Sequence, residues 1–327
     1  MLPTEVIPEG AGKPGKGTMT TDPKTLLVVA GPTASGKTDW ALWLAQHLDT
    51  EIISFDSRQL YREMRIGTAV PQPEELQAVT HHFIQSDSIH APVQAAQFAS
   101  RARRLADQLF QQYDVLVAVG GTGLYLKAWL EGLDDLPEPP QDVRHALRES
   151  WRRGEKNQLL EELKAQDFRT WQRIDRNNPS RVCRALEVIR SSGRPYSSFL
   201  GQNHWVCPYR VIKLAPAWPR DILYGRIERR VDAMMEAGLL EEAHSLLPHR
   251  SLRPLQTVGY QELFVYFDRL STLDTATQRI KQHTRQYAKR QLTWLRRDAS
   301  IHWMDGASEI HDSDVWNSYL RPMILSP

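Results

Sequence analysis

One eight-residue turn constrains the fold of this chain more than any other feature. The sequence Gly-Pro-Thr-Ala-Ser-Gly-Lys-Thr occupies residues 31–38, directly after the apolar run 26–30. Apolar residues then recur at helical spacing, as in Ala41, Leu44, Ala45 and Leu48. A Gly-rich turn that joins a strand to a helix and ends in Lys-Thr is typical of phosphate-binding loops. The sequence therefore predicts a strand, a phosphate-binding loop and a helix in direct succession.

Other segments extend this unit into an α/β fold. β-Branched, apolar runs predict strands at 26–30, 52–55, 115–119 and 211–214. Helical patterns lie between them, and long helices are expected at 221–236, 239–247 and 275–295. We expect a P-loop NTPase-like parallel sheet covered by helices on both faces. Ligands of such sheets bind beyond the carboxyl ends of the strands, where loops 31–38, 56–61 and 120–125 would converge.

A Pro-rich segment at 133–140 marks the boundary of a second unit. The pattern after it is helical to about residue 200 and returns to a strand at 211. We therefore expect a catalytic core of residues 25–135 and 205–310, interrupted by a helical insertion at 136–204. Residues 1–24 are expected to be a disordered leader, and residues 311–327 a C-terminal tail.

Composition narrows the class of protein. The chain has 327 residues, 41% of them hydrophobic, and no apolar stretch of the length that a membrane helix needs. Its two cysteines, Cys183 and Cys207, lack the spacing of a zinc site, so we expect free thiols in a cytoplasmic protein without membrane contact.

The formal net charge is only +2, but the charges are unevenly distributed. Residues 141–200 carry thirteen Lys or Arg against eight Asp or Glu, and residues 276–300 carry seven against one. Such regions either contact nucleic-acid phosphates or form solvated helix faces, and charge alone does not separate the two.

The ends of the predicted strands indicate the chemistry. Lys37 would supply a positive charge to a phosphate, and the Thr38 hydroxyl would bind Mg²⁺. A P-loop ATPase also needs an acidic residue at the end of a nearby strand, but the strand at 115–119 runs into Gly120-Gly121-Thr122-Gly123. Asp56 is the only acid at a matching strand end. The hydrogen-bonding and stacking residues that follow it, Ser57, Arg58, Gln59 and Tyr61, indicate a site for a second, planar substrate, unless Asp56 merely caps the next helix.

Several motifs together resemble one family. They include "GPTASGKT" (31–38), "DSRQLY" (56–61), "VGGTGLYLKA" (119–128), "RIERRVDAMMEAGLLEE" (226–242), "VGYQE" (258–262) and "TRQYAKRQLTWLRR" (284–297). Their order resembles that of the bacterial tRNA dimethylallyltransferases, also called tRNA isopentenyltransferases, from about residue 25 to 305. The resemblance implies transfer of a dimethylallyl group from dimethylallyl diphosphate to N6 of adenosine 37, in tRNAs that read codons beginning with U. The products would be N6-(dimethylallyl)adenosine and diphosphate.

The resemblance also implies roles for individual residues. Asp56, Thr122 and Arg230 would be catalytic, although Arg230 could instead be a surface charge in a ladder with Arg226. The diphosphate and Mg²⁺ would lie at the loop, with Thr38 as the protein ligand of the metal. The diphosphate-binding residues would be Gly31, Pro32, Thr33, Ala34, Ser35, Gly36, Lys37 and Thr38.

The partner implied by the resemblance is the tRNA anticodon stem-loop, bound by a monomer that flips adenosine 37 into a channel. The tRNA-binding residues would be Asp56, Ser57, Arg58, Gln59, Thr122, Arg144, Ser180, Arg181, Arg184, Gln256, Thr257, Val258, Gly259, Tyr260, Gln261, Lys289, Arg290 and Gln291.

Three other functions compete with this one. Prenylation of free AMP would need neither basic region, and a small-molecule kinase would need the missing strand-end acid. Non-enzymatic RNA binding would not explain why Asp56 is expected beside a phosphate-binding loop.

Overall fold

The computed structural model describes residues 24–307 and 312–325. Six parallel strands form one sheet in the order β3-β2-β4-β1-β5-β6. The strands are β1 (Thr25–Ala30), β2 (Ile52–Ser54), β3 (His81–His82), β4 (Val115–Gly120), β5 (Arg210–Ala217) and β6 (Ile301–Asp305). The predicted parallel α/β fold is confirmed.

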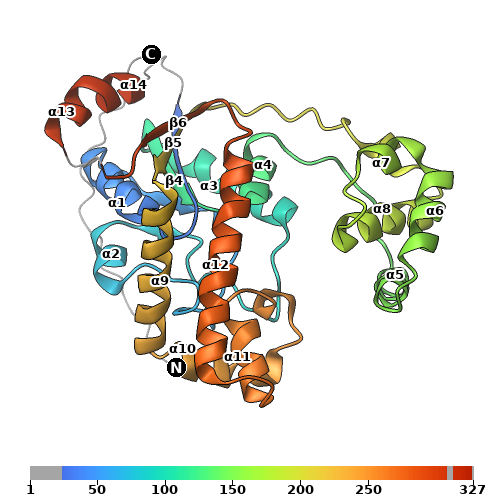
Figure 1. Cartoon of the computed structure of the whole chain (residues 1–327). Coiled ribbons are helices and arrows are strands. Elements are labelled where there is room, and N and C mark those ends of the chain that lie inside the picture. The colour runs from blue at the N-terminus through green and yellow to red at the C-terminus, as the bar shows by residue number, and fades with distance from the viewer. Residues whose placement is uncertain (1–23, 308–311, 326–327) are drawn as a thin grey trace, which may run out of the picture.

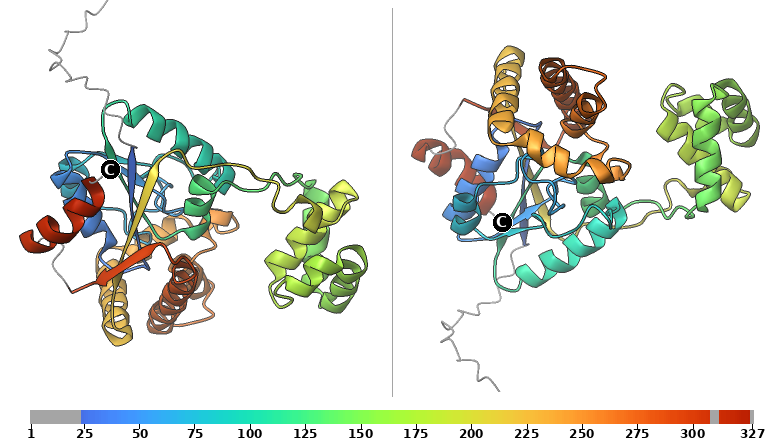
Figure 2. Two further views of the ribbon diagram at one scale, coloured as in Figure 1. Left: turned by 90° about the horizontal axis from the view of Figure 1, so that it is seen from above. Right: turned by 90° about the horizontal axis from the view of Figure 1, so that it is seen from below.

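Helices cover both faces of this sheet (Figures 1 and 2). The helices of the core are α1 (Lys37–His47), α2 (Pro73–Ala78), α3 (Ala95–Leu109), α4 (Gly123–Leu130), α9 (Arg220–Glu236), α10 (Leu239–Ser245), α11 (Tyr260–Phe267) and α12 (Leu273–Leu295). Short 3-10 turns lie at Leu247–His249 and Arg253–Leu255. No helix among the described residues is both long and apolar enough to cross a membrane.

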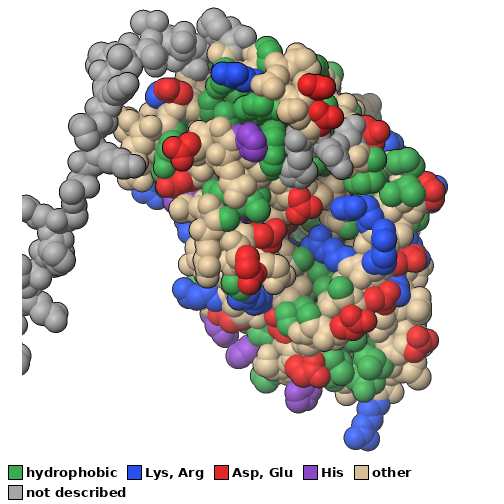
Figure 3. Space-filling view, turned by 90° about the vertical axis from the view of Figure 1, so that its left-hand side faces the viewer, with side chains coloured by type: hydrophobic (Ala, Val, Ile, Leu, Met, Phe, Trp, Pro, Cys, Tyr) green, Lys and Arg blue, Asp and Glu red, His purple; other side chains and the backbone are tan. Residues whose placement is uncertain are grey.

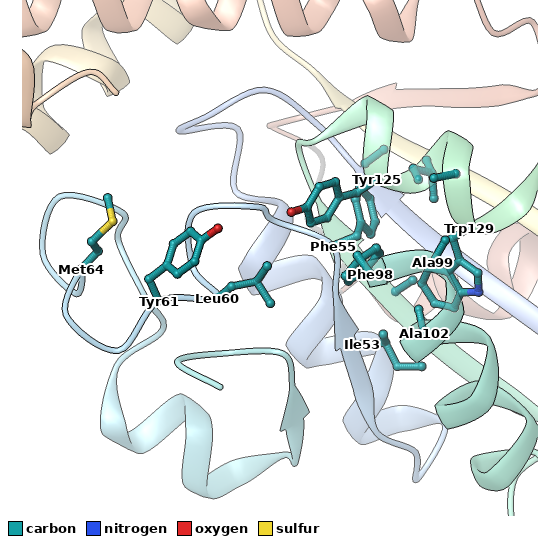
Figure 4. Close-up of a cluster of buried hydrophobic side chains, with 14 of the residues drawn as sticks. Ile53, Phe55, Leu60, Tyr61, Met64, Phe98, Ala99, Ala102, Tyr125 and Trp129 are labelled. Carbon is teal, nitrogen blue, oxygen red and sulfur yellow. The ribbon is translucent and has the colours of Figure 1, made fainter. Parts of the chain in front are cut away.

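The side chains of β1 explain why the sheet is covered on both sides. All six residues of β1 are buried. Leu26 and Val28 pack into one hydrophobic cluster, whereas Leu27 and Val29 pack into another, because successive side chains of a strand point to opposite faces. The first cluster includes Phe55, Phe98, Tyr125 and Trp129 (Figure 4), and the second is completed by α1.

Three segments differ from the expected pattern. Strands β3 and β6 were not predicted, and both lie at the edges of the sheet. Residues 312–325 form short helices, α13 (Ser313–Val315), a π-helical turn (Trp316–Leu320) and α14 (Arg321–Leu325). Leu320 and Ile324 are buried against α1, so the described part of the C-terminal segment belongs to the packed core. The expected leader lies outside the described residues except for Lys24.

Residues 141–199 form a helical lobe that lies apart from the sheet (Figure 1). Its helices are α5 (Gln141–Arg152), α6 (Lys156–Gln166), α7 (Phe168–Arg173) and α8 (Pro179–Ser192), with a 3-10 turn at Tyr196–Phe199. The lobe has a hydrophobic cluster of its own, which includes Leu147, Leu163 and Leu186. Two chain segments connect it to the core, and they are bonded to each other, since Asp134 Oδ1 accepts hydrogen bonds from the N–H groups of Gln202 and Asn203.

Candidate active site

The phosphate-binding loop lies between β1 and α1, as the sequence predicts, and α9 holds it in place. Arg226 Nε donates a hydrogen bond to the carbonyl oxygen of Ala34 at 2.8 Å. Trp218 Nε1 donates to the carbonyl oxygen of Ser35, also at 2.8 Å, and the Arg226 guanidinium stacks on the Trp218 ring. The Ser35 hydroxyl is buried and has no hydrogen-bond partner among the described residues. An unpaired buried hydroxyl in this loop is consistent with a site built for a polar ligand.

Two cations and one carboxylate meet beside the loop. Burial, followed by repulsion from Arg230, lowers the pKa of Lys37 to about 8. Burial also lowers the pKa of Arg230, and the negative charge of Asp56 opposes this effect. Arg230 is therefore no surface charge in a ladder with Arg226, which is bonded to the loop instead. Two partly buried cations that repel each other form a site whose charge an anion would balance.

Asp56 follows β2 and faces this group. Its Oδ1 accepts a hydrogen bond from the Arg58 N–H at 2.9 Å. Residues 57–60 form turns and no helix, so the carboxylate caps a turn at most. Oδ2 accepts no hydrogen bond from any residue that the structure describes. Burial and then the charge of Asp56 raise the pKa of Tyr287, on α12, to about 12, which places that phenol near the carboxylate.

Thr122 joins the loop after β4 to the loop after β2. Its Oγ1 accepts a hydrogen bond from the Ser57 N–H at 3.0 Å and donates one to Ser57 Oγ at 3.2 Å. Arg58 Nη1 donates to the carbonyl oxygen of Pro254, and Gln59 Nε2 donates to that of Ala69 at 2.7 Å. The three residues after Asp56 thus use polar side-chain atoms to connect loops of the core.

The loop after β4 opens into a cavity of about 1050 Å³ between the core and the helical lobe. Six of its nineteen lining residues are Lys or Arg and none is Asp or Glu. The cations are Lys127, Arg169, Arg173, Arg181, Arg184 and Arg290. By contrast, acidic and basic side chains are interspersed on the face of the molecule that points away from the lobe (Figure 3). The cavity therefore has the charge expected of a site for a polyanion.

The structure brings together only some of the predicted tRNA contacts. Six of them line the cavity, namely Thr122, Ser180, Arg181, Arg184, Arg290 and Gln291. Arg184 also pairs with Glu187 at 3.5 Å. Asp56 to Gln59, Arg144, Gln256 to Gln261 and Lys289 are not among the lining residues. Tyr260 is fully buried, with its hydroxyl bonded to Glu242, so its side chain offers no surface to a partner.

Comparison with known proteins identifies the family. The model of the IPP transferase family matches residues 59–298. The chain is 44% identical to the tRNA dimethylallyltransferase of Christiangramia forsetii, over 86% of this chain and 93% of that protein. It is 42% identical to tRNA dimethylallyltransferase 1 of Bacteroides fragilis, over 88% of this chain and 95% of that one. The chain belongs to the IPP transferase family.

Solved structures agree with this assignment. The crystal structure of the full-length tRNA isopentenylpyrophosphate transferase from Bacillus halodurans has a TM-score of 0.67 and 35% identity, and the match covers 92% of this chain and 95% of that one. A eukaryotic dimethylallyltransferase acting on tRNA has a TM-score of 0.76 at 22% identity, which indicates the same fold. The family resemblance seen in the sequence motifs is confirmed.

Within this IPP transferase, the cavity contains residues to which the sequence analysis gave no role in the site. Lys127, Arg169, Arg173, Tyr287 and Trp294 all line it. Arg169 and Arg173 lie on α7. They belong to the basic excess at 141–200, which predicted nucleic-acid contacts without indicating which residues would make them. Only the fold could show which of these thirteen cations face the core.

The same site limits how a magnesium ion would bind. No group of three or more His, Cys, Asp or Glu residues suited to a metal occurs in the described parts of the chain. Thr38 is the second residue of α1 and would be the one protein ligand of the ion. Mg²⁺ commonly takes few protein ligands and completes its octahedron with substrate phosphates and water. The loop therefore suits a metal that arrives with a diphosphate.

Proposed function

We propose that this enzyme transfers the dimethylallyl group of dimethylallyl diphosphate to N6 of adenosine 37 in tRNA. The observation that carries the proposal is the position of Asp56. Its charge acts on Lys37 of the phosphate loop and on Arg230 of α9, and it directly precedes Ser57, which is bonded to Thr122. A carboxylate repels an anion, so Asp56 would not bind the diphosphate itself. It would instead act on an uncharged group of a second substrate. The names of the relatives and the basic cavity favour an adenine of tRNA as that group.

The reaction follows from these positions. The N6 nitrogen forms a bond to C1 of the dimethylallyl group as the bond from C1 to the diphosphate oxygen breaks. Asp56 takes the proton that N6 loses, which is the work of a general base. Lys37 and Arg230 stabilise the negative charge that develops on the leaving diphosphate. A magnesium ion held by Thr38 would neutralise further charge on the same group.

The cavity provides for the nucleic acid. Six cations on its walls would contact phosphates of the anticodon stem-loop. Thr122, which also lines the cavity, would contact the extruded base. We include in the proposal that the enzyme works as a monomer in the cytoplasm, where its tRNA substrate is found.

The experiment uses mass spectrometry of the products. The enzyme is incubated with dimethylallyl diphosphate and Mg²⁺, without ATP, and is offered either unmodified tRNA or AMP. We expect one dimethylallyl group on adenosine 37 of tRNA and none on AMP. Modified AMP would establish the free-nucleotide reaction instead. Hydrolysis of ATP at a rate that matches tRNA modification would restore the kinase or ATPase interpretation.

A further inference from the structure

Gln291 on α12 connects the two halves of the active site. Its Oε1 accepts a hydrogen bond from the Thr33 N–H of the phosphate loop at 2.9 Å. Its Nε2 donates one to the carbonyl oxygen of Gly121 at 3.0 Å. The side chain is 8% exposed, so one buried amide bonds to the loop after β1 and the loop after β4 at once.

The glycines on either side of Thr122 make this contact possible. A Cβ atom at Gly121 would lie 2.3 Å from Gln291 Nε2, and one at Gly123 would lie 2.3 Å from the Trp294 ring. Since real Cβ atoms do not approach other atoms so closely, α12 packs directly against the backbone on both sides of Thr122. The position of α12 therefore fixes the position of Thr122.

The same helix also forms a wall of the tRNA cavity. Tyr287, Arg290 and Trp294 line that cavity together with Gln291. A nucleic acid bound there contacts α12, and α12 reaches the phosphate loop through the Gln291 amide. One rigid element is thus in contact with both proposed substrate sites.

We propose that Gln291 is a positioning residue that couples binding of the diphosphate to binding of tRNA, rather than a residue that contacts tRNA. The inference rests on the proposed function. Both polar atoms of its amide already bond to backbone groups of the two loops, so the side chain is held by the protein before any ligand binds. Coupling through the amide means that each ligand fixes a loop that the other ligand needs, so each raises the affinity for the other.

Binding measurements test the proposal. The affinity for a non-hydrolysable thiolo analogue of dimethylallyl diphosphate, with Mg²⁺, is measured with and without a saturating anticodon stem-loop RNA. The affinity for the RNA is measured with and without the analogue. In the wild-type protein we expect each ligand to tighten the other by at least about fivefold, and by the same factor in both directions because coupling is reciprocal.

The decisive variant is Gln291→Met, which has a similar volume and loses both hydrogen bonds. We expect each ligand alone to bind within about twofold of wild type, and the mutual tightening to fall below about twofold. The control is Gln286→Met, the same change at an exposed position of α12, which should keep the full coupling. Circular dichroism establishes that both variants are folded.

Three results would overturn the proposal. The first is wild-type protein whose ligands bind independently, and the second is Gln291→Met with undiminished coupling. The third is Gln291→Met that binds RNA weakly even without the analogue, which would make Gln291 a direct tRNA contact. Failure of the proposed function is distinguishable, because then wild-type protein would not prenylate tRNA in the product assay.

Discussion

At the scale of the residue, Asp56 is the group on which the chemistry depends. Asp56→Asn keeps an oxygen that can accept the Arg58 N–H, so the turn should survive. It removes the proton acceptor, for which losses of about 100- to 10,000-fold in rate are typical. We expect this loss in single-turnover prenylation, with the affinities for diphosphate and tRNA within a few-fold of wild type.

The matched control for this variant is Asp221→Asn, which removes an exposed carboxylate from the first turn of α9. Single-turnover rates near wild type in Asp56→Asn would remove this residue from the proposed mechanism.

Lys37 makes diphosphate binding depend on pH. Its pKa of about 8 in the free protein rises once a negative diphosphate lies beside it. Below pH 8 the lysine is charged in both states, so it adds no pH dependence to the affinity. Above pH 8 binding must take up a proton, so the affinity for dimethylallyl diphosphate should fall by up to about tenfold per pH unit. Titration calorimetry between pH 7 and 9 measures this decrease.

The control is Lys37→Arg, whose guanidinium stays charged throughout this range. We expect a flat affinity profile for it, and a flat profile in the wild-type protein would contradict the assigned role. The contribution of Lys37 to folding stability changes with pH in the opposite direction to the affinity. The pKa of Lys37 is below its usual 10.5, so the folded state binds fewer protons between about pH 8 and 10.5, and its contribution to stability rises with pH there.

The sequence could predict which residues belong to the site better than it could predict the contacts that these residues make. The phosphate loop and Asp56 were found because a short motif places them directly after a strand. Gln291 and Tyr260 were assigned to tRNA by the motifs around them. In the structure Tyr260 is fully buried, and Gln291 lines the cavity with its amide bonded to two loops of the core. Their hydrogen-bond partners, Thr33, Gly121 and Glu242, are distant in the sequence or lie in another motif, so no local pattern reveals the contact.

At the scale of the element, the predicted helices and central strands were found nearly where the periodicity placed them. The helix expected at 275–295 is α12, which begins at Leu273 and ends at Leu295. The edge strands were missed for physical reasons. Strand β3 has only two residues, and only one of the five residues of β6 is buried, so neither shows the buried apolar run of a central strand.

One carboxylate on α10 stabilises the loop between β2 and α2. Glu242 accepts hydrogen bonds from the N–H groups of Arg65, Ile66 and Gly67 and from the Tyr260 hydroxyl, at 2.7 to 2.9 Å. Glu242→Gln would replace one acceptor oxygen by a donor facing these groups. We expect the free energy of unfolding to fall by about 2–3 kcal/mol, the scale of a lost hydrogen bond to a charged group.

Urea unfolding measures this change. Glu241→Gln is the matched control, because the neighbouring side chain is exposed and should change stability by less than about 0.5 kcal/mol. Equal effects of the two substitutions would mean that the hydrogen bonds of Glu242 do not contribute to the free energy of unfolding.

At the scale of the whole molecule, the arrangement of two units makes the site. The Pro-rich boundary and the helical pattern after it indicated a helical unit, and the structure forms helices at 141–192. The cavity between that unit and the core could not be predicted, because its walls come from α4, α7, α8 and α12. The shape of the cavity depends on how the core and the lobe, each with a hydrophobic cluster of its own, are placed relative to each other. No periodicity in the sequence contains that information.

The last prediction concerns the charge of that cavity. Arg173 and Arg181 are exposed side chains of the helical lobe that line it, and neither has an ion-pair partner among the described residues. If each contacts a tRNA phosphate, replacing both by Ala should reduce the slope of log affinity against log salt concentration by about 1 to 2, given roughly 0.7–0.9 per contact. The affinity for dimethylallyl diphosphate should hardly change, because the phosphate loop lies in the core.

Arg148 and Arg152 provide the matched pair for this experiment. They are exposed on α5 of the same lobe but do not line the cavity. The double variant Arg148→Ala, Arg152→Ala removes the same net charge, so a general electrostatic attraction would weaken tRNA binding equally in both proteins. A specific docking surface requires a reduced salt slope only in the cavity variant. Equal slopes in the two double variants would show that the overall charge of the lobe attracts tRNA and that the cavity makes no specific phosphate contacts.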